Sequence, residues 1–258
     1  SDQESYKFDV ERKSFQSSKG DRRCGPGIRE LLMFYKREKK KNISLKPFNS
    51  FGISVQAKEF AVFSQPAELE ELLRAREEKV LVLGGGSNVL FTRDYDGIVL
   101  KNEIKGIEKA NENDAHVYVR AGAGESWHAF VQYCIEHELA GVENLSLIPG
   151  SVGASPMQNI GAYGAELKDV FHSLRAYHIY EKAVVEFDKA ACEFGYRESV
   201  FKHKYKNQFI ITDVVFRLNK KPVFNTSYGA IEQELGAMGV RELSLAAISD
   251  AIINIRRS

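Results

Sequence analysis

Four short segments of the chain combine residue types that could do chemistry. Three are rich in glycine and other small residues: LGGGSN (83–88), GAG (122–124) and PGSVGASPMQNIGAYG (149–164). The fourth, EFGYRESVFKHKY (193–205), gathers basic, acidic and hydroxyl side chains among aromatic ones. Glycine lets the backbone approach a ligand closely, and the consecutive N–H groups of such a loop can surround one anion.

Each glycine segment alone has a structural explanation that competes with ligand binding. LGGGSN can be a tight turn between two strands. It is not the Rossmann fingerprint G-x-G-x-x-G, which would need glycine at Val89 and a helix afterwards. GAG precedes a predicted helix start, where N–H groups are unpaired. Three such segments within about 80 residues together predict a long ligand with a diphosphate and a flat ring. FAD is favoured over NAD because the Rossmann unit is missing.

Arg197 follows a glycine and an aromatic residue, so we expect it on a constrained turn. There it could clamp a carboxylate in bidentate fashion. The alternative is a surface arginine paired with Glu198 or another neighbour. His203 is expected to be an exposed polar residue, because no second histidine or carboxylate has metal spacing with it. No metal site is predicted.

The elements that position these segments follow from hydrophobic periodicity. Residues 1–41 form a charged arm in which GIRELLMFYKREKKK (27–41) could be helical; its basic run is either a solvated face or a contact for nucleic acid. Helices are predicted at 66–78, with a stripe of Leu69, Leu72 and Leu73, at 126–139, with Ser126 as N-cap, and at 243–257. Strands are predicted at 51–56, 59–64, 79–83, 89–91, 96–102 and 116–122, and an antiparallel sheet from 171–180, 183–187 and 207–218.

Composition bounds the class of protein. The 258 residues are 43% hydrophobic and 28% charged, with a net charge of +1, which is typical of a globular protein and favours no charged partner. No apolar run reaches the roughly 18 residues of a membrane span, and no signal peptide opens the chain. The three cysteines, Cys24, Cys134 and Cys192, are widely spaced. We therefore expect a reducing, cytoplasmic location and no membrane partner.

Taken in order, the segments resemble the bacterial UDP-N-acetylenolpyruvoylglucosamine reductases, the MurB family. The matching pieces run from about residue 44 to the end: SLKPFNSFGI (44–53), VLVLGGGSNVLF (80–91), GAGESWHAFV (122–131), GVENLSLIPGSVGASPMQNIGAYGAEL (141–167), FGYRESVFK (194–202) and SYG (227–229). Residues 1–41 have no counterpart.

The resemblance implies an α+β fold of the vanillyl-alcohol-oxidase/MurB type. Its FAD-binding region would comprise two α+β subdomains, at 42–102 and 103–220, after the unassigned arm 1–41. Residues 221–258 would hold a tyrosine loop and a helix that leads to a third, substrate-binding domain. That domain is expected to be missing, because the chain ends INIRRS where the family continues.

The resemblance also implies an activity. NADPH would reduce bound FAD, and the flavin would then reduce the enolpyruvyl ether of UDP-N-acetylglucosamine to UDP-N-acetylmuramate, a peptidoglycan precursor. Arg197 would be catalytic, stabilising charge on the substrate carboxylate, and Tyr228, on a mobile loop, and Tyr163 would bind the substrate. The residues matching the FAD-contacting loops are Gly84, Gly85, Gly86, Ser87, Asn88, Gly122, Gly124, Ser151, Gly153, Ala154, Ser155, Gly161 and Gly164.

One part of the family pattern has no match. The serine that protonates the enolate and a glutamate near the far carboxyl end have no counterpart in residues 1–258, so this chain alone is expected to be inactive. The alternative is a truncated, non-catalytic FAD-binding module of the same family. The partner is expected to be a small nucleotide-sugar substrate, with no nucleic acid, and the protein a monomer.

Overall fold

The computed structural model describes residues 39–74 and 79–258. The predicted amino-terminal helix, and the basic run considered as a contact for nucleic acid, fall mainly outside these residues. Their last two residues, Lys40 and Lys41, lie in a strand, β1 (Lys40–Ser44). Among the described residues, no helix combines the length and the apolar character that crossing a bilayer requires.

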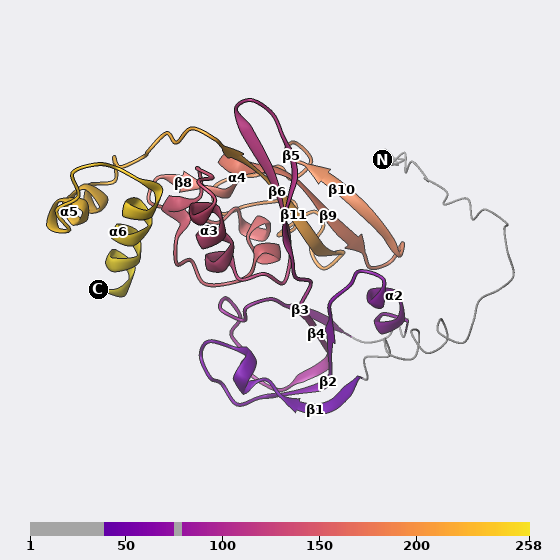
Figure 1. Cartoon of the computed structure of the whole chain (residues 1–258). Coiled ribbons are helices and arrows are strands. Elements are labelled where there is room, and N and C mark those ends of the chain that lie inside the picture. The colour runs from indigo at the N-terminus through magenta and orange to yellow at the C-terminus, as the bar shows by residue number, and fades with distance from the viewer. Residues whose placement is uncertain (1–38, 75–78) are drawn as a thin grey trace, which may run out of the picture. The chain divides into compact units, whose positions relative to one another are not determined.

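The first sheet has four strands in the order β1-β2-β4-β3 (Figure 1). The other three strands are β2 (Gln56–Phe63), β3 (Val80–Leu83) and β4 (Tyr95–Asn102). β2 and β3 run parallel to β4, whereas β1 runs antiparallel to β2. The apolar run of β4 is buried, as expected for a central strand with parallel neighbours.

Two of the predicted strands in this region are wrong or shorter than expected. VLF (89–91) is not a strand but part of the connection from β3 to β4, and of 51–56 only Gln56 is in a strand. Because β3 and β4 are parallel neighbours, the chain must return along the sheet before β4 begins. Phe91 is buried beside Leu83, and Leu90 is exposed. Phe91 therefore packs in an apolar cluster without a strand partner.

The predicted helix at 66–78 is α2 (Glu68–Leu72) in the residues that the structure describes. It begins just after Pro66, and its predicted stripe of Leu69, Leu72 and Leu73 is buried. These leucines share an apolar cluster with Tyr177 and Ile210. Since those two residues belong to the second sheet, the cluster joins the two sheets.

The second sheet is antiparallel throughout, with the order β10-β9-β11-β6-β5, and it contains the three strands that were predicted to form an antiparallel sheet. Its strands are β5 (Ile107–Glu112), β6 (His116–Gly122), β9 (Phe171–His178), β10 (Ala183–Asp188) and β11 (Phe209–Asn219). β5 was not predicted, because IEKANE is almost wholly exposed and polar. As an edge strand with one neighbour, it needs no alternating apolar face.

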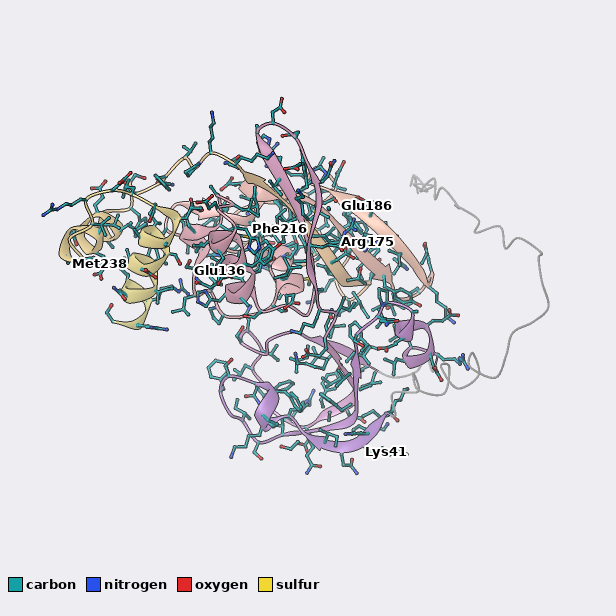
Figure 2. All side chains as sticks on the ribbon, viewed as in Figure 1. Lys41, Glu136, Arg175, Glu186, Phe216 and Met238 are labelled. Atoms are coloured by element: carbon teal, nitrogen blue, oxygen red, sulfur yellow. The ribbon has the colours of Figure 1, made fainter. Side chains whose placement is uncertain are left out.

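Helix α3 (Trp127–Glu136) packs on one face of the second sheet. Ser126 caps it as predicted, accepting a hydrogen bond from the Ala129 N–H. Trp127 and Phe130 contact Phe216 of β11, with ring centroids 5.8 and 4.3 Å apart. Figure 2 shows Phe216 in this crowded core beside α3.

The long glycine-rich segment is built from short elements. The single-turn 3₁₀ helix η2 (Glu143–Leu145) precedes it, and two more single turns, η3 (Val152–Ala154) and η4 (Pro156–Gln158), lie within it. A small hairpin of β7 (Gly161–Ala162) and β8 (Ala165–Glu166) follows, and then α4 (Leu167–Val170). Another single turn, η1 (Lys46–Phe48), lies in the first sheet's region. The segment is thus folded on itself in tight turns.

Two helices end the chain, α5 (Gly229–Ala237) and α6 (Leu245–Arg257). They share an apolar cluster of Ile231, Leu235, Ile248 and Ile252 and lie side by side in Figure 1. α6 was predicted, and its buried residues follow helical spacing. α5 was not predicted, since the SYG segment was expected to be a loop. Ser249 of α6 bonds Ser146, with 2.8 Å between their hydroxyl oxygens, which joins this helix pair to the glycine-rich region.

Candidate functional site

The three glycine-rich segments of the sequence meet in the structure. A Cβ placed on Gly84 would lie 2.3 Å from the Ser151 hydroxyl oxygen, and one on Gly85 would lie 3.0 Å from the Gly150 Cα. A Cβ on Gly153 would lie 2.5 Å from the Cβ of Ala123, in the GAG segment. Because any side chain there would force the loops apart, these glycines are required for the loops to touch one another.

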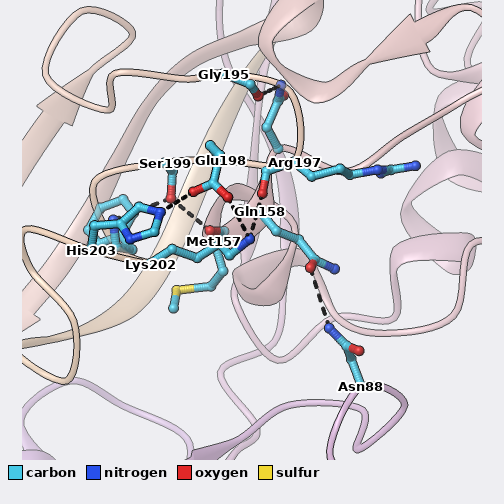
Figure 3. Close-up of polar contacts among 11 residues, drawn as sticks. Asn88, Met157, Gln158, Gly195, Arg197, Glu198, Ser199, Lys202 and His203 are labelled. Atoms are coloured by element: carbon cyan, nitrogen blue, oxygen red, sulfur yellow. Dashed lines mark hydrogen bonds and ion pairs between the residues drawn. The ribbon is translucent and has the colours of Figure 1, made fainter.

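The loop after β3 leaves a run of backbone N–H groups without partners. Within the described residues, the N–H groups of Gly85, Gly86, Ser87 and Asn88 donate no hydrogen bond. Gly86 has φ +67°, and the Phe48 carbonyl oxygen would lie 2.0 Å from a Cβ there. The Asn88 amide donates to the Gln158 side chain at 3.4 Å (Figure 3). Successive unpaired N–H groups on a tight loop suit an anion.

A cleft of about 250 Å³ lies where these loops meet. Its walls come from β3, from β11 and from the glycine-rich segment, and its lining residues are Val80, Leu81, Val82, Gly84, Asn102, Ala123, Ser151, Gly153, Ala154, Met157, Ile179, Asn207, Phe209, Ile210 and Ile211. Four predicted cofactor residues are among them. The volume lies just below the range of about 300–1,000 Å³ typical of small-molecule sites, so the cleft can enclose part of a dinucleotide.

The remaining predicted cofactor residues are not among those that line the cleft. Gly122 and Gly124 are buried, and a Cβ on either would strike the backbone of residues 103–104 at 2.4 and 2.7 Å. Ser155 is also buried, and its hydroxyl donates to the Val152 carbonyl at 2.7 Å. Gly161 and Gly164 lie in the β7–β8 hairpin. Gly122, Gly124 and Ser155 therefore make close packing contacts or hydrogen bonds within the protein itself.

The second sheet supplies one wall of the cleft, which the sequence did not predict. Asn102, at the end of β4, donates to the Ile211 carbonyl at 3.0 Å and accepts from the Ile104 N–H at 3.0 Å. Ile179 and Phe209 line the same cleft. In the sequence, apolar strand residues of this kind look like ordinary core, and no local signal distinguishes them.

Arg197 lies on a constrained turn, as predicted. Its φ is +56°, and Gly195 and Glu198 on either side exchange two backbone hydrogen bonds of 3.1 and 3.3 Å. The side chain is exposed, and its Nη2 donates to the Gly161 carbonyl. The Lys202 ammonium donates to the Arg197 carbonyl at 2.8 Å (Figure 3). The turn therefore presents a guanidinium to solvent beside the glycine-rich segment.

Glu198 pairs with two basic side chains, Lys202 and His203, and not with Arg197. Its carboxylate accepts hydrogen bonds from Lys202, at 2.9 Å, and from the largely exposed His203. These bonds hold the pKa of the Glu198 carboxyl below its ordinary value. Within the described part of the chain, no carboxylate lies within ion-pair distance of Arg197. The alternative of an arginine neutralised by Glu198 is thus not what the structure shows.

The two predicted substrate tyrosines meet at the tip of the hairpin. The rings of Tyr163 and Tyr228 lie edge to face. Tyr163 and Gly164, both with positive φ, form the tip of the hairpin, and Tyr228 directly precedes α5. The buried Asn144 amide donates to the carbonyls of Tyr163 and Asn225, both at 2.9 Å. One hairpin therefore lies between the arginine turn and Tyr228.

No cluster of histidine, cysteine or carboxylate groups that could hold a metal ion occurs among residues 39–74 and 79–258. Cys134 and Cys192 are free and buried. Burial, followed by the Asp188 charge, raises the pKa of Cys192 to about 12. Neither thiol is therefore suited to act as a nucleophile.

Comparison with known proteins agrees with this arrangement. Residues 60–180 match a family described as an FAD binding domain. The chain is 50% identical over 219 residues to a UDP-N-acetylenolpyruvoylglucosamine reductase of Amoebophilus asiaticus, covering 84% of this chain and 65% of the relative. A reductase of the same name from Flavobacterium johnsoniae is 47% identical over the same shares of both chains.

Solved structures support the fold. The Thermus caldophilus reductase (MurB) matches with a TM-score of 0.64 at 22% identity, over 86% of this chain and 70% of that one. A Physcomitrella patens BBE-like protein matches with a TM-score of 0.52 at 12% identity, over 74% and 44%. The predicted α+β fold of the MurB type is confirmed. Over its matched residues, this chain is similar to UDP-N-acetylenolpyruvoylglucosamine reductases, and it spans about 65% of the length of these curated relatives.

Proposed function

We propose that this chain supplies the FAD-binding part of an NADPH-dependent reductase that converts UDP-N-acetylglucosamine enolpyruvate to UDP-N-acetylmuramate, a step of peptidoglycan precursor synthesis. The observation that carries the proposal is the identity of 50% over 219 residues with a reductase of that name. The meeting of the glycine loops, the arginine turn and the two tyrosines in one region supports it. An enzyme of this kind is an oxidoreductase of the cytoplasm, and we expect it to be a monomer.

FAD fits the residues at the cleft. The unpaired N–H groups of residues 85–88 suit the diphosphate, and the Ser87 hydroxyl and Asn88 amide add donors. The apolar walls from β3 and β11 suit a flat ring. When bound, FAD would accept a hydride from NADPH and store it between the two substrates. The alternative of a non-catalytic FAD-binding module would share this site.

Arg197 has the properties that stabilisation of an enolate-like charge requires. Reduction of the enolpyruvyl double bond places new negative charge on the substrate carboxylate, so a fixed cation there is worth more in the transition state than before it. Its guanidinium has five N–H donors, and one bond to Gly161 leaves a fork for a carboxylate.

The proposal also covers the two tyrosines and the division of the chain into subdomains. Tyr228, with 53% of its surface exposed, and its neighbour Tyr163 would contact the nucleotide part of the substrate. We assign residues 42–102 and 103–220 to two FAD-binding subdomains, and residues 221–258 to the segment that leads toward a substrate domain.

Purification of the full-length protein tests the proposal. It should carry flavin absorbance and oxidise NADPH much faster when UDP-N-acetylglucosamine enolpyruvate is present. A colourless protein that takes up no added FAD would exclude the cofactor. A yellow protein whose NADPH oxidation ignores the enolpyruvyl substrate would instead favour the non-catalytic module.

A further inference from the structure

Asn159 is a buried polar residue in the middle of the glycine-rich segment, outside the lining of the cleft. Its exposed fraction is 0%, and its φ is +40°. Asparagine enters this left-handed region more readily than most residues other than glycine. A buried amide also needs partners for its donors and its acceptor, because an unpaired polar group costs about 1–3 kcal/mol.

The partners of Asn159 lead to the arginine turn. Its amide nitrogen donates to the Gly195 carbonyl at 2.9 Å, and its amide oxygen accepts from the Lys168 N–H at 3.0 Å. Gly195 opens the turn that carries Arg197, and the same carbonyl accepts from the Glu198 N–H. One buried side chain thus fixes the entry to the turn against the start of α4.

The exit from the turn is held to the same segment. The Ser199 hydroxyl donates to the Met157 carbonyl at 2.7 Å (Figure 3). The Arg197 guanidinium donates to the Gly161 carbonyl. Met157, Asn159 and Gly161 therefore contact the exit, the entry and the tip of the turn in that order. Of these three tethers, only that of Asn159 uses a side chain of the glycine-rich segment.

We infer that Asn159 is the positioning residue of Arg197, an inference that rests on the proposed function. Arg197 is exposed and has a left-handed backbone, a conformation that costs roughly 1–2 kcal/mol for a residue with a Cβ. The surroundings must therefore hold it. A charge stabiliser acts only if it is fixed before the reaction, and a misplacement of about 1 Å can cost about 10²-fold in rate. Asn159 supplies the buried, paired anchor that keeps the guanidinium in place.

Two half-reactions of the full-length protein test the inference. In Asn159→Ala, reduction of the enolpyruvyl substrate by the reduced flavin should slow by about 10 to 10²-fold, while reduction of the flavin by NADPH should stay within about twofold. Asn159→Gly, which accepts the positive φ but lacks the amide, should behave in the same way. In a background of Arg197→Ala, Asn159→Ala should cause no further loss. Losses that multiply in the double variant would overturn the inference.

Hydrogen exchange tests it without turnover. Loss of the Asn159 amide should loosen the turn, so the Glu198 N–H should exchange faster in Asn159→Ala, while the Val131 N–H in α3 should not change. The surface variant Asn111→Ala should match the wild type in both measurements. Unchanged exchange at Glu198 would overturn the inference. If the wild-type protein does not reduce the enolpyruvyl substrate, the proposed function fails, and the exchange result still decides the role of Asn159.

Discussion

The rings of Tyr163 and Tyr228 meet edge to face, with centroids 5.5 Å apart and planes at 87°. Tyr163 belongs to the hairpin that accepts the Arg197 hydrogen bond, and Tyr228 directly precedes α5. The contact therefore connects the glycine-rich region with the final helix pair. It gives both tyrosines a structural role beside the substrate role that we propose.

This pair should show a measurable coupling. An edge-to-face contact is worth about 0.5–1.5 kcal/mol, and the exposure of Tyr228 favours the lower half of that range. In a double-mutant cycle with Tyr163→Leu and Tyr228→Leu, the free energy of unfolding in urea should give a coupling of about 0.5–1 kcal/mol. The same cycle between Tyr163 and the 82%-exposed Tyr196 should give none. Equal values for both cycles would refute the contact.

Gly84→Ala should destabilise the protein by about 1–3 kcal/mol, because the new methyl group would overlap the Ser151 hydroxyl. Adding Ser151→Ala should restore part of that loss, since the nearest remaining contact, the Ser151 Cβ, lies at 3.4 Å. Gly236→Ala in α5 meets nothing within 4 Å and should be neutral or stabilising by up to about 1 kcal/mol. Thermal unfolding of these three variants and the wild type checks the order. A Gly84→Ala protein as stable as Gly236→Ala would contradict the close contact.

Arg197→Ala should leave flavin reduction by NADPH unchanged and slow reduction of the enolpyruvyl substrate by about 10²–10³-fold, as for loss of one charge stabiliser. Arg197→Lys keeps the charge but loses the fork of N–H donors, so its rate of enolpyruvyl reduction should lie between those of the wild type and Arg197→Ala. Stopped-flow absorbance of the flavin separates the two steps, and the exposed Arg217→Ala on β11 serves as the charge control. An equal loss in both steps would assign Arg197 to the cofactor instead.

His128 should make stability depend on pH. Burial, and then the Arg257 charge, lowers its pKa below the ordinary value of 6.5, and its Nδ1 accepts the Leu147 N–H at 3.1 Å. The folded state therefore binds the proton less readily than the unfolded state. The contribution is fully present above about pH 6.5 and is lost as pH falls through the lowered pKa. Urea unfolding between pH 8 and 5 measures it. His128→Asn, whose side chain can still accept the Leu147 N–H, should flatten the dependence of unfolding free energy on pH. If the variant keeps the same pH dependence as the wild type, His128 is not its cause.

The sequence predicted most elements that have a strong local pattern. α3 and α6 have helical spacing and serine caps, and the long apolar strands β9 and β11 could be placed within a few residues. β5 and β1 were missed because IEKANE and KKNIS are polar, and their pairing comes only from a neighbouring strand. The wrong strand at 89–91 had the right residue types but no partner.

The candidate site was predicted in its loops and not in its walls. Each glycine segment alone had a competing structural explanation. Their convergence could still be inferred, because three such segments lie close together in the sequence. The cleft wall from Ile210 and Ile211 could not, since no local pattern says that these buried strand residues also face a cleft. Asn159 gave no signal either, because its partner Gly195 is distant in sequence. The FAD contacts of the individual glycines remain predictions.

The hydrogen bond from Asn102 to Ile211 joins residues that are 109 positions apart. A ribosome that has completed β4 must therefore add the whole second sheet before the other wall of the cleft exists. At about 5–20 residues per second, that delay is on the order of 10 s. During it, the apolar face around Phe63 and Leu69 lacks its partners Tyr177 and Ile210. The nascent first sheet thus exposes an apolar face to which chaperones can bind, and a ligand of the cleft can bind only after β11 has emerged.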